Sequence, residues 1–178
     1  MTHTIYTTEA IVINRVDTAD VDLTLWLLTK DLGLIVAKAS GVRKEAAKMR
    51  NYLQTFNLLN VALVRGRYVW RLTGAESYTQ KVDKLTGKAL INFANISNFL
   101  RRMTIPEGSV DLYRLLVVVR KELILAKSDK DLRRIEVLAM AKILVQLGYM
   151  SSSILSHKPI RLSKLIVDIN KAINESHL

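Results

Sequence analysis

The sequence predicts an α+β protein in which a small closed β-barrel precedes a helical domain. Five runs rich in Val, Ile, Thr and aromatic residues lie between residues 5 and 76, separated by turn signals. From about Lys81 onward, apolar residues instead recur at the three- and four-residue spacing of helices. Five short strands in about 75 residues, with one longer connection after the third, are typical of a closed barrel. We therefore expect two domains, residues 1–80 and 81–178.

Polar residues or glycines separate the predicted strands. The five strands are expected at Ile5–Val16, Leu23–Lys30, Leu34–Ser40, Phe56–Arg65 and Arg67–Gly74. A polar segment at residues 17–20 follows the first strand, and Gly33 closes a tight hairpin because glycine adopts positive φ at little cost. Gly66 provides the turn between the last two strands.

The predicted helices begin and end at recognisable capping residues. We expect them at Val110–Lys127, Leu132–Leu147 and Leu162–Ile173, and Val110–Lys127 is apolar over more than half of its circumference. Ser128 or Asp129 is suited to cap the second of these helices, and Gly148 lies where a helix-terminating glycine belongs. The three serines at 151–153 are expected to form a loop.

The composition favours a polyanionic partner and excludes cysteine chemistry. The 178 residues include 27 Lys+Arg and 16 Asp+Glu, a net charge of +11. Nucleic acid is the commonest polyanion that so basic a protein meets, although a basic composition also occurs without such a partner. The absence of cysteine excludes disulfides, thiolate metal sites and cysteine nucleophiles. With neither a signal peptide nor an apolar stretch of about 20 residues, the expected location is the cytoplasm.

No motif in the sequence predicts catalysis or a cofactor. His3, His157 and His177 do not have the spacing of metal ligands, so we expect no metal site. The acidic pairs at residues 20/22 and 129/131 lie in turns, where carboxylates commonly bond to the local backbone. The glycine-rich phosphate loops and the nucleophile elbow of hydrolases are also absent from the sequence. The sequence therefore predicts a protein that is not an enzyme.

Basic residues gather in two parts of the predicted barrel. Between residues 43 and 71 the single acid Glu45 is outnumbered by Arg43, Lys44, Lys48, Arg50, Arg65, Arg67 and Arg71. Four of them lie on the connection after the third strand, and three flank Gly66. Such loops line the groove that follows a nucleic-acid backbone in small barrels. The alternative interpretation is a solvated loop whose charge only maintains solubility.

The aromatic residues of the barrel divide between core and surface. Two-residue alternation in the fifth strand places Arg67 and Arg71 on one face and Tyr68 and Trp70 on the other. If the arginines face a ligand, Tyr68 and Trp70 belong to the core. Tyr52, beside the basic connection, is the candidate for stacking against a base.

Basic residues also cluster in the helical half. Lys81, Lys84 and Lys88 fall on one face of a predicted helix, and arginines are paired at residues 101/102 and 133/134. They either extend a binding surface or form an ordinary solvated face.

Several ordered segments of the β half resemble the RecO family of bacterial recombination mediators. The resemblance rests on Tyr6–Val12, Leu27–Gly33, Lys38–Lys44, Leu53–Leu59, Arg65–Arg67 and Leu72–Glu76. In the helical half it is looser and rests on Leu147–Tyr149 and the amphipathic C-terminal helix.

The resemblance implies an OB-fold followed by a helical domain. It also implies binding of single- and double-stranded DNA, strand annealing without ATP, and cooperation with RecR to help RecA replace single-strand-binding protein. The family's basic OB-fold residues correspond to Arg43 and Lys44, and Arg65 and Arg67 lie in the matching hairpin. Lys48, Arg50 and Arg71 are candidates on charge alone.

The chain departs from the family pattern after Tyr149. Many members carry a four-cysteine zinc module there, whereas Met150–His157 occupies this place without cysteine. Zinc is therefore not expected. The family's groove for the tail of single-strand-binding protein lies in the helical domain, and its residues have no identifiable counterparts in this sequence.

Two hypotheses follow. The first is a DNA-binding, strand-annealing mediator whose basic residues neutralise phosphates. The second is a protein-interaction adapter in which the barrel is a scaffold and the helix Val110–Lys127 presents a groove to an acidic, aromatic-ended peptide. The adapter predicts weak, salt-insensitive DNA binding. An enzyme is the third and least supported possibility.

Overall fold

The computed structural model describes residues 4–18, 22–40, 47–77, 84–103, 111–156 and 161–176. These residues form two compact units. The first contains the described residues up to 77 together with residues 111–113, and the second contains residues 84–103 and the described residues from 114 onward. Arg43 and Lys44 lie outside the described residues.

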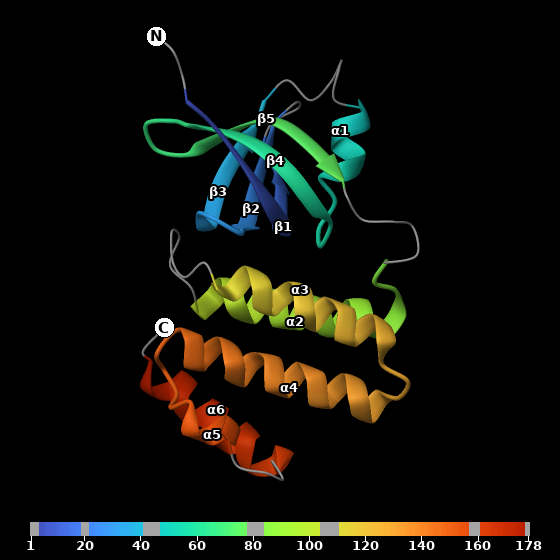
Figure 1. Cartoon of the computed structure of the whole chain (residues 1–178), viewed down its shortest axis with the longest axis vertical. Coiled ribbons are helices and arrows are strands. Elements are labelled where there is room, and N and C mark those ends of the chain that lie inside the picture. Colours follow the sequence, from blue (N-terminus) through green and yellow to red (C-terminus); the bar gives the residue numbers. More distant parts are fainter. Residues whose placement is uncertain are drawn as a thin grey trace. The chain divides into compact units, whose positions relative to one another are not determined.

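Five strands close into a barrel in the first unit (Figure 1). They are β1 (Ile5–Asp17), β2 (Leu23–Thr29), β3 (Gly33–Ala39), β4 (Leu58–Arg65) and β5 (Trp70–Ser77). The order around the barrel is β1-β2-β3-β5-β4, and only the β3–β5 pair is parallel. This closed five-stranded barrel followed by helices confirms the predicted α+β class with an N-terminal OB-fold.

The length of β1 allows the barrel to close. Residues Ile5–Ile11 pair with β4, whereas residues from Ala10 to Asp17 pair with β2. A register shift between Val12 and Asn14 marks an irregularity of the kind that bends strands in small barrels. Strand β1 is therefore hydrogen-bonded to both β2 and β4, and this closes the barrel.

The barrel encloses a single apolar core. Alternate residues of each strand point inward, so that side chains such as Val12, Leu25 and Leu63 are fully buried. Hydrophobic burial of this kind contributes roughly 1.5–3 kcal/mol per large side chain.

A short helix, α1 (Ala47–Tyr52), lies on the connection between β3 and β4. The sequence predicted only a long connection here. Six residues contain fewer than two helical turns, which is too short for a recognisable periodic pattern, and tertiary packing stabilises the helix instead. Leu53 directly after it is fully buried in the barrel core, and Met49 packs against the same core.

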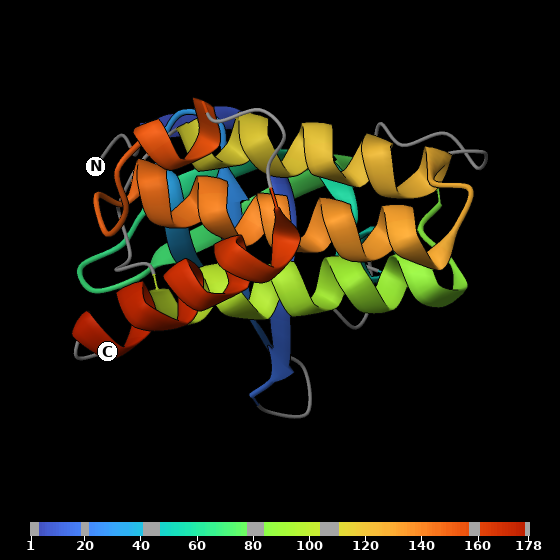
Figure 2. The ribbon, with the colours of Figure 1, turned by 90° about the horizontal axis from the view of Figure 1, so that it is seen from below.

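The second unit is helical. Its elements are α2 (Gly87–Met103), α3 (Asp111–Leu125, from residue 114 onward), α4 (Asp129–Gln146), α5 (Ser153–Ser156) and α6 (Leu162–Glu175). Helix α4 packs against both α2 and α6, and Figure 2 shows α6, drawn in red, crossing α4 obliquely. Ala141, Leu144, Leu165 and Ile169 contribute to the core that joins them.

The predicted capping residues at both ends of α4 are confirmed. The Ser128 hydroxyl accepts a hydrogen bond from the Asp131 N–H at 3.2 Å, so Ser128 is the N-cap. Gly148 has a φ of 81°, and the Tyr149 N–H donates to the Leu144 carbonyl at 2.8 Å. A glycine that ends a helix in this left-handed conformation satisfies the last carbonyls.

Two predictions for this unit are wrong. Lys84 precedes α2, which begins at Gly87, so Lys84 and Lys88 do not share a helical face as expected. Lys81, the third lysine of that set, lies outside the described residues. The serine segment is not entirely a loop, because Ser153 begins the short helix α5. Among the described residues, no helix is both long enough and apolar enough to cross a membrane.

Candidate nucleic-acid interface

Two of the basic residues predicted for DNA binding, Arg65 and Arg67, lie at the β4–β5 hairpin. Arg65 ends β4 and Trp70 begins β5, so residues 66–69 form the connection. The Gly66 N–H donates to the Val69 carbonyl at 3.1 Å. A Cβ on residue 66 would collide with that carbonyl oxygen, so this close approach requires glycine. The tight turn carries Arg67 and Tyr68 at its tip.

Trp70 lies at one end of the barrel and belongs to its core, as predicted. Its side chain is buried, and the Arg65 guanidinium carbon lies 5.7 Å from the centre of its ring. The Tyr6 ring meets it edge to face, with the ring centres 5.3 Å apart. Arg65 and Trp70 are direct partners across the β4–β5 ladder, which explains why the guanidinium covers the indole.

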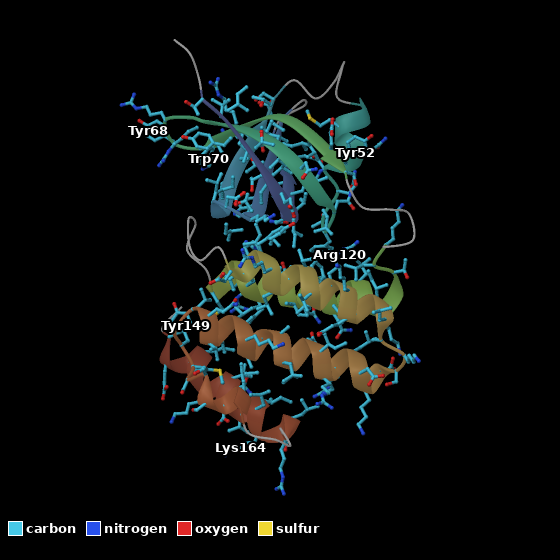
Figure 3. All side chains as sticks on the ribbon, viewed as in Figure 1. Tyr52, Tyr68, Trp70, Arg120, Tyr149 and Lys164 are labelled. Carbon is cyan, nitrogen blue, oxygen red and sulfur yellow. The ribbon has the colours of Figure 1, made fainter. Side chains whose placement is uncertain are left out.

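The prediction that Tyr68 belongs to the core is wrong. Its side chain is 84% exposed, and Figure 3 shows it at the outer end of the hairpin. The alternation used in the prediction requires a continuous strand from Arg67, but β5 begins only at Trp70. Residues 67–69 therefore follow the turn and not the pleat. The Arg67 guanidinium carbon lies 5.2 Å from the centre of the Tyr68 ring.

A hollow of about 300 Å³ lies beside this hairpin. It is lined by Ile35 and Val36 of β3 and by residues 65–70 of the hairpin. The lining contains two arginines and no acidic residue. Apolar side chains with arginines at the margin suit a ligand that has a flat apolar part and a negative group.

The parallel pairing of β3 and β5 adds a basic residue that sequence reasoning missed. Lys38 and Arg71 are register partners in this pair, and both side chains are exposed. Residues that are paired in register project from the same face of a sheet. Lys38 lay within a segment that resembles the RecO family, but only the β3–β5 pairing places it beside Arg71.

Another predicted site residue, Tyr52, is not brought to this hairpin. Tyr52 ends α1 and is 37% exposed, and Figure 3 shows it on the side of the barrel opposite Tyr68. Its backbone carbonyl accepts a hydrogen bond from the Asn57 amide nitrogen at 2.9 Å. Helix α1 also carries Lys48 and Arg50. Of the predicted residues, Arg65 and Arg67 both line the hairpin hollow, whereas Arg71 lies in β5 outside this lining and pairs with Lys38.

A second hollow of about 290 Å³ lies between α2 and α4. Its lining has mixed charge, with Lys88, Asp129, Arg133 and Glu136 among its members. The Lys88 ammonium pairs with the Asp129 carboxylate at 2.5 Å, and Glu136 accepts a hydrogen bond from Asn95 at 2.8 Å. Ile91, also in the lining, is 60% exposed.

Comparison with known proteins relates the barrel to one family. Residues 1–80 match the family described as "Recombination protein O N terminal". A protein named DNA repair protein RecO from Dehalococcoides mccartyi is 36% identical over 72 residues, which cover 40% of this chain and 28% of the relative. The homologue of the same name from a second strain of that organism is 29% identical over 120 residues, 66% of this chain and 47% of the relative.

A more distant relative extends the similarity into the helices. The DNA repair protein RecO of Gloeobacter violaceus is 27% identical over 166 residues, which cover 87% of this chain and 61% of the relative. The chain thus spans less than two thirds of the length of each of these three proteins. These matches confirm the resemblance to the RecO family and assign the barrel, over residues 1–80, to the N-terminal domain of that family.

Proposed function

We propose that the protein is a DNA-binding recombination mediator that acts in DNA repair. Residues 1–80 would form the DNA-binding domain and residues 81–178 the helical domain, within the cytoplasm. The single observation that carries the proposal is the exposed β4–β5 hairpin, whose hollow is lined by Arg65 and Arg67 and by no acidic residue. The names of the relatives, DNA repair protein RecO, support the same conclusion.

The chemistry of this group suits a phosphate backbone. Arginine carries a charge at every physiological pH and presents a planar set of donors that matches phosphate oxygens. Each phosphate that it neutralises releases condensed cations, so affinity falls as salt rises. If the barrel makes about six contacts with a single strand, the slope of log affinity against log salt is near −4.

Strand annealing would follow from the same neutralisation. Two complementary strands repel each other through their phosphates, and basic side chains that hold both strands lower this repulsion without consuming ATP. The resemblance to RecO further suggests RecR and the tail of single-strand-binding protein as partners, with RecA acting downstream. Arg43, Lys44, Lys48 and Arg50, which lie on the β3–β4 connection in the sequence, would make further phosphate contacts.

The proposal is tested by titrating labelled single- and double-stranded oligonucleotides and following fluorescence anisotropy at several salt concentrations. Replacing Arg65, Arg67 and Arg71 together with Glu should reduce affinity for both DNA forms by at least about 100-fold, since each charged contact contributes roughly 1.5–3 kcal/mol. The matched control replaces Lys121, Lys127 and Lys130 with Glu. All three are exposed residues of the helical half and give the same change in net charge.

Equal losses in the two triple variants would contradict a specific role for the hairpin. A wild-type protein whose weak binding does not depend on salt would contradict the proposal as a whole. Mixing complementary strands with the protein, without ATP, then tests annealing directly.

A second candidate function is the protein-interaction adapter. The sequence assigned its peptide groove to the helix Val110–Lys127, whereas the structure offers the hollow between α2 and α4. Its lining combines exposed Ile91 with Lys88 and Arg133, which suits a peptide that has both apolar and acidic side chains. A labelled acidic peptide ending in an aromatic residue distinguishes the candidates. Tight peptide binding together with weak DNA binding would favour the adapter, and the opposite result would favour the mediator.

A further inference from the structure

We infer that the β4–β5 hairpin stacks one unpaired base on Tyr68 and thereby favours single-stranded over double-stranded DNA. This inference rests on the proposed function, because it concerns how the same hairpin would hold DNA.

The first observation is the exposure of an aromatic ring that has no structural role in the barrel. Tyr68 is 84% exposed, whereas Trp70, two residues later, is buried in the core. Tyr6, which packs edge to face against Trp70, is 40% exposed and therefore much less exposed than Tyr68. Tyr68 is therefore held in water at the tip of a turn that Gly66 fixes, where its ring is accessible to a ligand.

The second observation is the charge next to that ring. The Arg67 guanidinium carbon lies 5.2 Å from the ring centre, and the high exposure of Tyr68 shows that Arg67 leaves most of the ring accessible. Arg65 lies at the margin of the adjoining hollow, over Trp70. A nucleotide unit has a flat π-system joined to a phosphate, and the hairpin offers an aromatic ring and two cations within one turn of chain.

The third observation is the size and polarity of the hollow. Its volume of about 300 Å³ is at the lower limit of small-molecule pockets, so it can admit one planar ring but not a base-paired helix. Its side chains from Ile35, Val36 and Val69 are apolar. These three side chains carry no hydrogen-bonding group, so this part of the hollow offers a base an apolar surface for stacking.

These observations together favour single strands. In a duplex, both faces of each base are covered by neighbouring bases, and access to a face requires unstacking. An unpaired strand exposes its bases without that cost. Arg65 and Arg67 would contact the phosphates of both single- and double-stranded DNA. Tyr68 would stack only on an unpaired base.

The test compares Tyr68→Ala and Tyr68→Phe with the wild-type protein on single- and double-stranded oligonucleotides of the same mixed sequence. We expect Tyr68→Ala to weaken single-strand binding by between about 5- and 150-fold, the range for loss of one stacked base, and to change duplex binding by less than about twofold. Tyr68→Phe keeps the ring and should keep single-strand affinity within about twofold of wild type.

Tyr149→Ala is the matched control. It removes a tyrosine of the helical unit that is 37% exposed. It should change single-strand affinity by no more than about threefold, because Tyr149 does not line the hairpin hollow. Circular dichroism should show Tyr68→Ala folded, since the side chain is not part of the core.

A spectroscopic measurement reports the stacking itself. An oligonucleotide that carries a fluorescent adenine analogue should lose fluorescence on binding to wild type and to Tyr68→Phe, but not on binding to Tyr68→Ala at saturating protein. Unchanged single-strand affinity of Tyr68→Ala, or an equal loss on both DNA forms, would overturn the inference while leaving the proposed function intact. Absence of DNA binding by the wild type would overturn both.

Discussion

Two hollows among the described residues are nearly equal in size, but one is lined by positive charge only and the other by charges of both signs. The hairpin hollow of the barrel, about 300 Å³, is lined by two arginines and no acid. The α2–α4 hollow of the helical unit, about 290 Å³, contains Lys88 and Arg133 together with Asp129 and Glu136. A polyanion gains energy from a site only where the cations are not already neutralised by local carboxylates.

The comparison teaches that net charge alone does not locate an anion site. Both units contain exposed basic residues, and the whole chain has a charge of +11. In the helical hollow, Lys88 is paired with Asp129 at 2.5 Å. In the hairpin hollow, the guanidinium carbons of Arg65 and Arg67 lie 5.7 and 5.2 Å from the ring centres of Trp70 and Tyr68, and no acidic residue lines the hollow.

The largest expected effect comes from reversing two charges in each hollow. Arg65→Glu with Arg67→Glu should weaken single-strand DNA binding by more than about 100-fold, because two charged contacts are replaced by repulsion. Lys88→Glu with Arg133→Glu changes the net charge equally and should weaken it by less than about threefold. Anisotropy titrations at one salt concentration measure both. Similar losses would mean that the total charge, and not its position, governs binding.

A smaller effect tests the turn that shapes the hairpin hollow. Gly66→Ala forces a Cβ into the Val69 carbonyl and should destabilise the protein by about 1–3 kcal/mol. Gly74→Ala is the matched control, since its Cβ would meet only the Ala62 Cβ at an ordinary 3.6 Å. Chemical denaturation gives both free energies of unfolding. An equally stable Gly66→Ala variant would show that the hairpin adapts without cost.

The basic margin outside the hairpin hollow should contribute less. Lys38→Gln removes one exposed charge beside Arg71 and should reduce the magnitude of the single-strand salt slope by about 0.7, the value for one phosphate contact. Affinities measured between about 50 and 200 mM salt determine the slope. Because a backbone contact does not depend on base accessibility, duplex binding should also weaken. An unchanged slope would exclude Lys38 from the interface.

The smallest effect is expected at the ion pair of the helical hollow. Lys88 and Asp129 have side chains that are 68% and 72% exposed, so Lys88→Met should cost less than about 1 kcal/mol of unfolding free energy. Thermal denaturation at low and high salt measures it. A larger loss, or one that high salt does not diminish, would indicate that this pair supports the fold more than its exposure suggests.

Strand and helix positions could be predicted because they depend on local patterns. Runs rich in Val, Ile, Thr and aromatic residues, bounded by turn signals, located all five strands, and Ser128 and Gly148 marked the ends of α4. The basic residues of the hairpin could be listed for the same reason. The short helix α1 could not be found, since six residues contain less than two helical turns and its stability comes from packing on the barrel.

The sequence by itself determined the barrel-then-helices class, the apolar core and the positions of Arg65 and Arg67. Each depends on composition or on periodicity within one segment. Only the tertiary structure decided that Tyr68 is exposed, because this depends on where β5 begins after the Gly66 turn. It also decided that Lys38 joins Arg71, because a parallel pair between β3 and β5 unites residues that are distant in sequence. Hydrogen bonding between distant segments, which no local pattern encodes, brings Lys38 to Arg71, whereas the geometry of the Gly66 turn exposes Tyr68.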